Sequence, residues 1–316
     1  MENAILCLPT DLLRSIQRYT SINFLLNTSS QLKFDKYELY YWKLNKEHSL
    51  EYHNDSKYRT NVDSKLRKGL SQLSLNLSRE SRTIHFLDLD YAEMVNVSYT
   101  KVMDVNVLGN VHTLNLCGCL NLVDVSALGN VHTLNLSNCP NLVDVSALGN
   151  VHTLNLSKCN KLKDVSMLTN VYNLNLSYCR LITDVNALGN THTLNLTDCC
   201  FIKNVSALGN VHTLNLSYCD DIVDVSALGN VHTLDLSHCY YLMNVSALSN
   251  VYNLNLSHCH RLVDVNILRN VHILNLSYCY DVKDISALGN VHTLILFRCP
   301  FITDKSTLKN VANLLL

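Results

Sequence analysis

The chain has 316 residues, of which 47% are hydrophobic and 16% charged, and its formal net charge is -1. No basic or acidic excess is present to attract nucleic acid or an anionic membrane, so these partner classes are excluded. Apolar runs fall well short of the roughly 20 residues of a membrane helix, and the start MENAILCLPTDLLRS is a poor signal peptide. We therefore expect an intracellular, cytoplasmic protein with no membrane partner.

The first 83 residues lack the periodicity of the rest of the chain and predict a small α-helical module. LPTDLLRSI predicts a helix that begins near Pro9, a residue suited to a first turn. SINFLLNTSSQL predicts a second helix and DKYELYYWKL a third, in which Asp35 and Glu38 are spaced like a capping box. We assign this module to 1–45, and a helical linker or amino-terminal cap to 46–83. One side of the first helix carries the apolar residues Leu8, Leu12, Leu13 and Ile16.

A 20-residue unit, VHTLNLSNCPNLVDVSALGN at 131–150, recurs ten times over 111–310. An irregular unit with IHFLDLD at 84–90 precedes these ten, and VANLLL at 311–316 follows them. Counted from Val131, positions 1, 4, 6, 9, 12, 15 and 18 are apolar. Val-x-x-Leu-x-Leu alternates like a short strand, and the spacing of three that follows leaves room for a 3₁₀ or extended return. We expect parallel strands about 4.8 Å apart, in a curved sheet on the order of 50 Å long.

Several columns of the repeat predict scaffold roles. An Asn ends each unit, a Gly often precedes it, and an Asp such as Asp144 opens the return, where it is placed to cap backbone amides. A cysteine at position 9 predicts a ladder of buried free thiols in a reducing compartment, with disulfides or a metal as the alternatives. On the concave face we expect Thr133, Asn135 and Ser137, with the Asn side chains bonded from strand to strand.

The motif LxxLxLxxC followed by DVSAL resembles leucine-rich repeats over roughly 84–316. Its cysteine resembles that of the cysteine-containing repeats in F-box proteins. The resemblance implies an α/β solenoid, namely a leucine-rich repeat horseshoe with a parallel β-sheet on the concave face and short 3₁₀ or extended returns. The small helical module would precede this solenoid.

Variation is concentrated just after each strand, at positions 8, 10, 11 and 13, which we expect to share one edge of the solenoid. Tyr, His and Arg recur there, and such residues are enriched where proteins bind each other. Drift at exposed loops is the alternative. The candidate target-binding residues are Tyr178, Tyr218, His238, Tyr240, Tyr241, His258, His260, Arg261, Tyr278, Tyr280 and Arg298.

We predict neither a catalytic site nor a bound metal or cofactor. His258, Cys259 and His260 are adjacent, but we expect the thiol to point inward and the imidazoles elsewhere. A column of histidines before the strands, such as His132, contains Tyr172 and Tyr252, and Tyr cannot replace a general base. We therefore expect that the protein is not an enzyme.

The opening LPxDLLxxI, with Trp42 and Leu44 downstream, resembles an F-box over about residues 7–45. This resemblance implies binding to the Skp-type adaptor of a cullin ubiquitin ligase through Leu8, Pro9, Leu12, Leu13 and Ile16. F-box-like heads on such regular arrays resemble repeat-protein families of giant DNA viruses, which would imply the host cytoplasm. The implied function is a substrate receptor that holds an unknown target protein. A repeat module without a ligase connection, or a self-associating structural protein, are the alternatives.

Overall fold

The computed structural model describes residues 41–44, 46–63, 72–79 and 92–316. The residues for which adaptor binding is predicted lie outside this part of the chain, and so does the irregular unit expected at 84–90. The predicted adaptor-binding residues are Leu8, Pro9, Leu12, Leu13 and Ile16. Their predicted roles therefore remain predictions.

Within the described residues, fourteen strands form a single parallel sheet in strict chain order, β1 to β14. Equal positions of successive units pair, so that Leu134 of β5 lies opposite Leu154 of β6. The strands are β1 (Tyr41–Lys43), β2 (Gln72–Asn76), β3 (Ala92–Asn96), β4 (Thr113–Asn115), β5 (Thr133–Asn135), β6 (Thr153–Asn155), β7 (Asn173–Asn175), β8 (Thr193–Asn195), β9 (Thr213–Asn215), β10 (Thr233–Asp235), β11 (Asn253–Asn255), β12 (Ile273–Asn275), β13 (Thr293–Ile295) and β14 (Asn313–Leu315).

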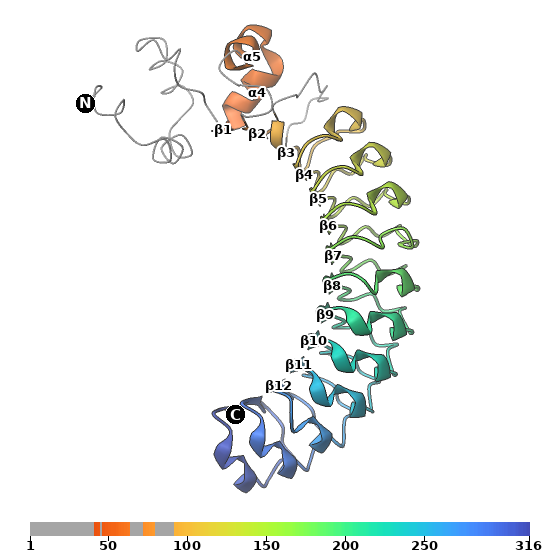
Figure 1. Cartoon of the computed structure of the whole chain (residues 1–316), viewed down its shortest axis with the longest axis vertical. Helices are drawn as coiled ribbons and strands as arrows, with labels where there is room; N and C mark the ends of the chain where they lie inside the picture. Colours follow the sequence, from red (N-terminus) through yellow and green to blue (C-terminus); the bar gives the residue numbers. More distant parts are fainter. Residues whose placement is uncertain (1–40, 45, 64–71, 80–91) are drawn as a thin grey trace, which may run out of the picture.

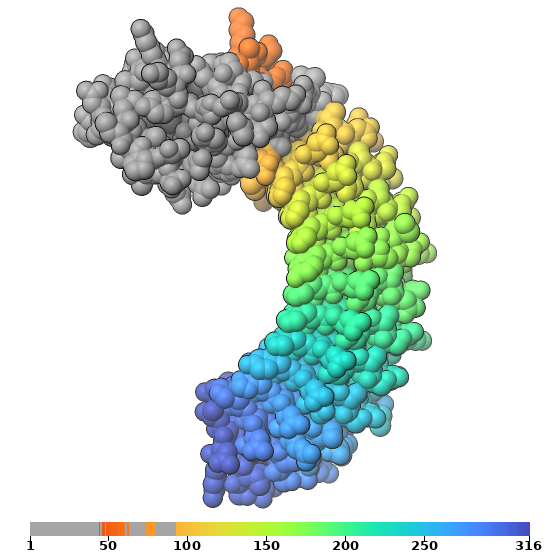
Figure 2. Space-filling model, in the orientation of Figure 1, coloured from red at the N-terminus to blue at the C-terminus, as the bar shows by residue number. Residues whose placement is uncertain are grey.

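Short 3₁₀ helices form most of the returning arms. Each unit is therefore wider at its arm than at its strand. The stack therefore curves into a crescent (Figure 2), with the strands on its inner face and the arms on its outer face (Figure 1). These helices are η1 (Asn106–Leu108), η2 (Ser126–Leu128), η3 (Ser146–Leu148), η4 (Asn186–Leu188), η5 (Ser206–Asn210), η6 (Ser226–Asn230), η7 (Ser246–Asn250), η8 (Asn266–Leu268), η9 (Ser286–Asn290) and η10 (Ser306–Asn310).

The core lies between the strands and the arms and runs continuously through the stack. The seven apolar positions of the 131–150 unit are all buried, with at most 3% of any of these residues exposed. The burial that the periodicity predicts is therefore confirmed. The seven buried residues are Val131, Leu134, Leu136, Cys139, Leu142, Val145 and Leu148.

The Asp at position 14 caps the return as expected. Asp144 Oδ1 accepts a 2.8 Å hydrogen bond from the backbone N–H of Ser146, at the start of η3. This bond lowers the pKa of the Asp144 carboxyl. Asn204 makes the same bond to Ser206 at 3.0 Å, so the amide acceptor serves as well as the carboxylate.

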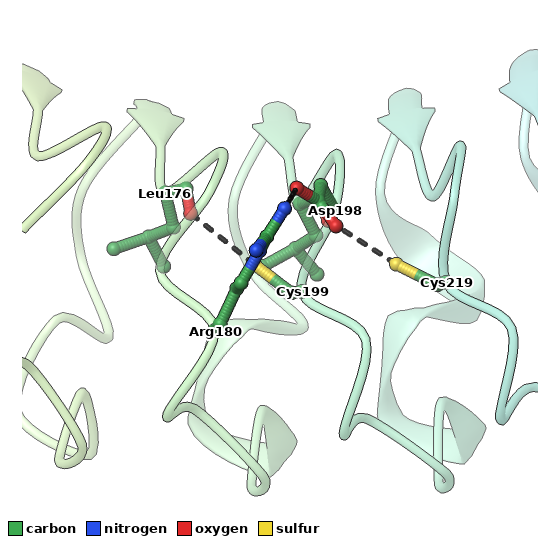
Figure 3. Close-up of polar contacts among 6 residues, drawn as sticks. Leu176, Arg180, Asp198, Cys199 and Cys219 are labelled. Atoms are coloured by element: carbon green, nitrogen blue, oxygen red, sulfur yellow. Dashed lines mark hydrogen bonds and ion pairs between the residues drawn. The ribbon is translucent and has the colours of Figure 1, made fainter. Parts of the chain in front are cut away.

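The cysteine column forms a ladder of free thiols with one repeated contact. Each thiol donates to the carbonyl oxygen at position 6 of the preceding unit, as Cys199 Sγ does to Leu176 at 3.2 Å (Figure 3). Cys219 makes the same 3.2 Å bond to Leu196. Burial raises the pKa of Cys159 and of Cys179 to about 12. The column therefore packs as small apolar residues, as its position in the repeat predicts.

The amino-terminal part of the sheet differs from the prediction in two ways. Residues 41–43 form strand β1, so the helix expected over 35–44 is wrong at its end; Tyr and Trp favour a strand, and β2 offers the backbone partners. The sheet already contains β2, and so it begins before the expected boundary at residue 84. Arg79 and Tyr99 also have the positive φ angles, 59° and 58°, that mark position 8 of the later units.

Between β1 and β2 the described residues form the helices α4 (Lys46–Asn54) and α5 (Ser56–Asp63). Tyr52 and Val62 bury their side chains in the same core as the repeats. Ser49 accepts the N–H of Asn76 through its Oγ at 2.8 Å, which fixes α4 against the end of β2. No described helix is long and apolar enough to cross a membrane. The division into three domains stays a prediction.

Candidate functional site

Position 8 of each unit adopts a left-handed backbone conformation just after the strand. Lys158, Tyr178, Tyr218 and His258 have φ angles of 61–64°, in the region that favours glycine. In the ten units, position 8 is a glycine only at Gly118. Two hydrogen bonds hold the turn. Asn155 Oδ1 accepts a bond from the N–H of Ser157 at position 7, and the Lys158 N–H donates to the carbonyl oxygen of Ser177 in the next unit. Side chains at position 8 are thus projected outward by a rigid turn.

The Asn at position 5 therefore has a different role from the one predicted. Asn135 Oδ1 accepts a 3.0 Å bond from the N–H of Ser137 in its own turn. The same bond recurs at 3.0 Å between Asn155 and Ser157. A strand-to-strand bond at position 5 joins Asn255 Nδ2 and Asp235 Oδ2 at 3.2 Å. In the other described units that carry Asn at this position, the expected ladder is replaced by the bond to the N–H of the unit's own turn.

Four rings at position 8 stack in the carboxy-terminal half of the solenoid. The ring centroids of Tyr218, His238, His258 and Tyr278 are 4.1, 4.1 and 4.2 Å apart in succession. The spacing follows from the strand separation of about 4.8 Å. Desolvation in this stack lowers the pKa of both His238 and His258, and His260 adds to the effect in each case.

Residues at positions 10 and 11 widen the stack into a surface. His260 stacks on Tyr280 at 4.9 Å, and its Nδ1 lies 3.0 Å from the carbonyl oxygen of Tyr278. Arg261 lies over the ring of Tyr241 at 5.1 Å. Tyr240, Tyr241 and Tyr280 keep 40–47% of their surface exposed.

Ten of the eleven predicted target-binding residues fall within units 6 to 10, and we call these ten the ring edge. Tyr178 lies apart from them, since unit 5 carries Asp198 at position 8 in place of a ring, where it forms an ion pair with Arg180 (Figure 3). Tyr178 contacts Lys158, whose Nζ is 5.5 Å from the ring centroid. The ring edge comprises Tyr218, His238, Tyr240, Tyr241, His258, His260, Arg261, Tyr278, Tyr280 and Arg298.

Two further aromatic residues extend the ring edge. Phe297 is 46% exposed and contacts the Tyr278 ring at 5.8 Å, and Phe301 is 54% exposed. Arg298 lies 5.8 Å from the Tyr278 ring. The sequence already marked Phe297 as unusual, because the last unit reads LFRC where several other units read LSYC.

No group of three His, Cys, Asp or Glu side chains among the described residues is arranged to hold a metal ion. The Cys259 thiol is buried and donates to the carbonyl of Leu236 at 3.1 Å, away from the imidazole of His258. The His258 and His260 rings meet edge to face at 5.9 Å.

Solved structures of similar shape identify the fold. An internalin of Listeria monocytogenes aligns over 85% of this chain and 92% of its own, with a TM-score of 0.58 and 19% identity. The fold is a leucine-rich repeat solenoid. A leucine-rich repeat protein of Leptospira interrogans gives the same TM-score of 0.58 at 18% identity, over 94% of this chain and 87% of its own.

At these identities the likeness concerns the fold alone. No model of a known protein family matches the sequence, and no curated protein matches it.

Proposed function

We propose that the protein is a non-catalytic binding module that holds a partner protein against the ring edge. The observation that carries this proposal is the stack of rings at position 8 together with the exposed Tyr240, Tyr241 and Tyr280 beside it. A residue other than glycine in the left-handed region costs on the order of 1–2 kcal/mol, and units 6 to 9 place Tyr or His there. All ten units share this turn, so the feature particular to the ring edge is that Tyr or His occupies it in four successive units.

The experiment compares partners captured by three forms of the full chain. The wild type and Lys158→Ala should enrich the same proteins, while Tyr240→Ala combined with Tyr278→Ala should lose at least one of them. Lys158 is a matched control because it has the same left-handed turn at φ 63° but lies outside the ring edge. Equal capture by all three forms, each with an unchanged melting temperature, would contradict the proposal.

The finer proposal is that the protein acts as a substrate receptor of a Skp and cullin ubiquitin ligase, which it joins through Leu8, Pro9, Leu12, Leu13 and Ile16. The F-box resemblance of LPTDLLRSI supports it. In this role the chain would position a target for the ligase and carry out no chemistry itself. It implies a cytoplasmic setting, with which the twelve free cysteines among the described residues agree.

Adaptor binding is tested with the purified Skp-type adaptor and the full chain. Wild type should bind, and Leu12→Asp combined with Leu13→Asp should abolish binding without changing the melting of the solenoid. Tyr240→Ala combined with Tyr278→Ala should leave adaptor binding unchanged. If the wild type does not bind the adaptor, the receptor role is wrong and the binding module alone remains.

A further inference from the structure

A second column of rings runs along the solenoid, on the side where the strands begin. Position 2 of every unit, directly before the strand, is His or Tyr. Each ring stacks on the next, with centroids 4.4–5.0 Å apart and interplanar angles of 7–18°. We call this set the ring column: His112, His132, His152, Tyr172, His192, His212, His232, Tyr252, His272 and His292.

The ring column is exposed and its histidines are held in one orientation. Eight of its ten residues are exposed and two half-buried. In seven units Nδ1 lies 3.1–3.3 Å from the hydroxyl of the Thr that follows, as in His132 and Thr133. This contact occupies Nδ1, so Nε2 is the ring nitrogen open to a partner. Given strands about 4.8 Å apart, the column offers such nitrogens over on the order of 40 Å.

Few charges accompany this row of imidazoles. The residues before and after each ring, and the Asn that ends the preceding unit, are uncharged in all ten units. On adjoining elements, β10 ends in Asp235 and Arg269 precedes β12, while Tyr172 and Tyr252 are the other titratable members of the column. An ion pair lies at the head of the column, where Glu93 Oε1 is 3.6 Å from Nδ1 of His112.

Glu93 has the same place in its strand as the histidines have in theirs. Met94 of β3 pairs with Thr113 of β4. Glu93 directly precedes Met94, just as His112 directly precedes Thr113, so the two residues hold equal positions. A carboxylate thus sits in line with the imidazoles and interacts with the first of them. This pair places a carboxylate against an imidazole of the column on its Nδ1 side, whereas a partner laid along the outside would meet Nε2.

We infer that the ring column is a binding strip for an acidic polypeptide, engaged when its imidazoles take up protons. Histidine changes charge in the range between about pH 5 and 8. Protonated neighbours in one stack repel each other, and a chain of carboxylates laid along Nε2 removes that repulsion. Desolvation, and then His112 and His152, lower the pKa of His132. A carboxylate attracts the protonated imidazole more than the neutral one, so the partner and the proton favour each other's binding.

The test uses fluorescent poly-L-glutamate and the full chain at fixed ionic strength. The affinity should be at least about tenfold higher near pH 5.5 than near pH 7.5. Replacing His132, His152, His212 and His232 by Tyr should remove most of this gain. Because Tyr172 and Tyr252 already stack in the column, these substitutions keep the rings and the fold.

The matched control changes histidines of the ring edge, His238→Tyr with His258→Tyr, where Tyr218 and Tyr278 occupy equal positions. This variant should keep the acid-induced affinity. Equal affinity at both pH values, or equal loss in the two variants, would overturn the inference. Tighter binding of inorganic polyphosphate than of poly-L-glutamate would also overturn the choice of a carboxylate partner.

Discussion

The Cys199 thiol and the carbonyl oxygen of Leu176 are joined by a 3.2 Å hydrogen bond across two neighbouring units. The next residue, Cys200, makes no such contact and is half-buried. Two thiols adjacent in sequence thus differ in burial and in hydrogen bonding, because position 9 of the unit faces the core and position 10 faces the edge.

This pair predicts selective alkylation. In the native protein at about pH 8, iodoacetamide should modify Cys200 and leave Cys199 free, because burial raises the pKa of Cys199 and the thiolate is the reactive form. Peptide mass spectrometry after a short exposure measures both sites. Unfolding in urea should make them react alike. Equal modification in the native state would show that the thiol ladder is wrong.

A buried hydroxyl predicts a stabilising substitution. Thr191 stands where the other nine units have Val, is 1% exposed, and its Oγ1 has no hydrogen-bond partner among the described residues. Thr191→Val should raise the free energy of unfolding by about 1–2 kcal/mol, measured by urea titration. The control Thr193→Val, two residues on and only half-buried, should give no comparable gain. A loss of stability in Thr191→Val would contradict the assignment.

The left-handed turn predicts which residues position 8 accepts. Lys158→Val should lower the free energy of unfolding by about 1–2 kcal/mol, because a β-branched residue fits poorly at a φ of 63°. Lys158→Asn should be neutral or stabilising, since Asn138 already occupies this place at φ 58°. Urea unfolding of both variants gives the comparison. Equal stability of the two would argue against the turn.

The repeat predicted the core because burial follows directly from apolar spacing. Leu134, Leu136 and Leu142 recur at distances that only a short strand and a tight return can bring to one side. The ten ring-edge residues were also predicted, since equal positions of a solenoid must lie side by side. The stacking of those rings follows from the same strand spacing and could have been inferred.

The features that the sequence did not reveal depend on the backbone. A φ of 64° at Tyr178 leaves no trace in residue type, because Tyr ordinarily avoids that region. Asn135 was assigned the wrong partner for the same reason, since its acceptor role exists only once the turn forms. Strand β1 was taken for a helix because its pairing with β2, some 30 residues later in the chain, has no local signature.

The aspartates of the returning arms predict how stability responds to acid. Hydrogen bonds from the serine two residues on lower the pKa of Asp124, Asp144 and Asp164 below the ordinary value of 3.8. The backbone N–H contributes most for Asp124 and Asp144, and the serine side chain contributes most for Asp164. The stabilisation is therefore complete above the pKa of the unfolded chain, about 3.9, and is lost as the pH falls through the lower folded values. Changing all three to Asn should keep the bonds, as Asn204 does, and remove this part of the pH dependence.

Urea midpoints between about pH 3 and pH 6 measure the effect. The wild type should lose stability toward the acid end more steeply than the triple Asn variant. The corresponding triple Ala variant should be weaker at every pH, because it leaves the N–H groups of Ser126, Ser146 and Ser166 without their side-chain acceptors. Parallel pH curves for wild type and the Asn variant would show that these carboxylates do not contribute to the acid response.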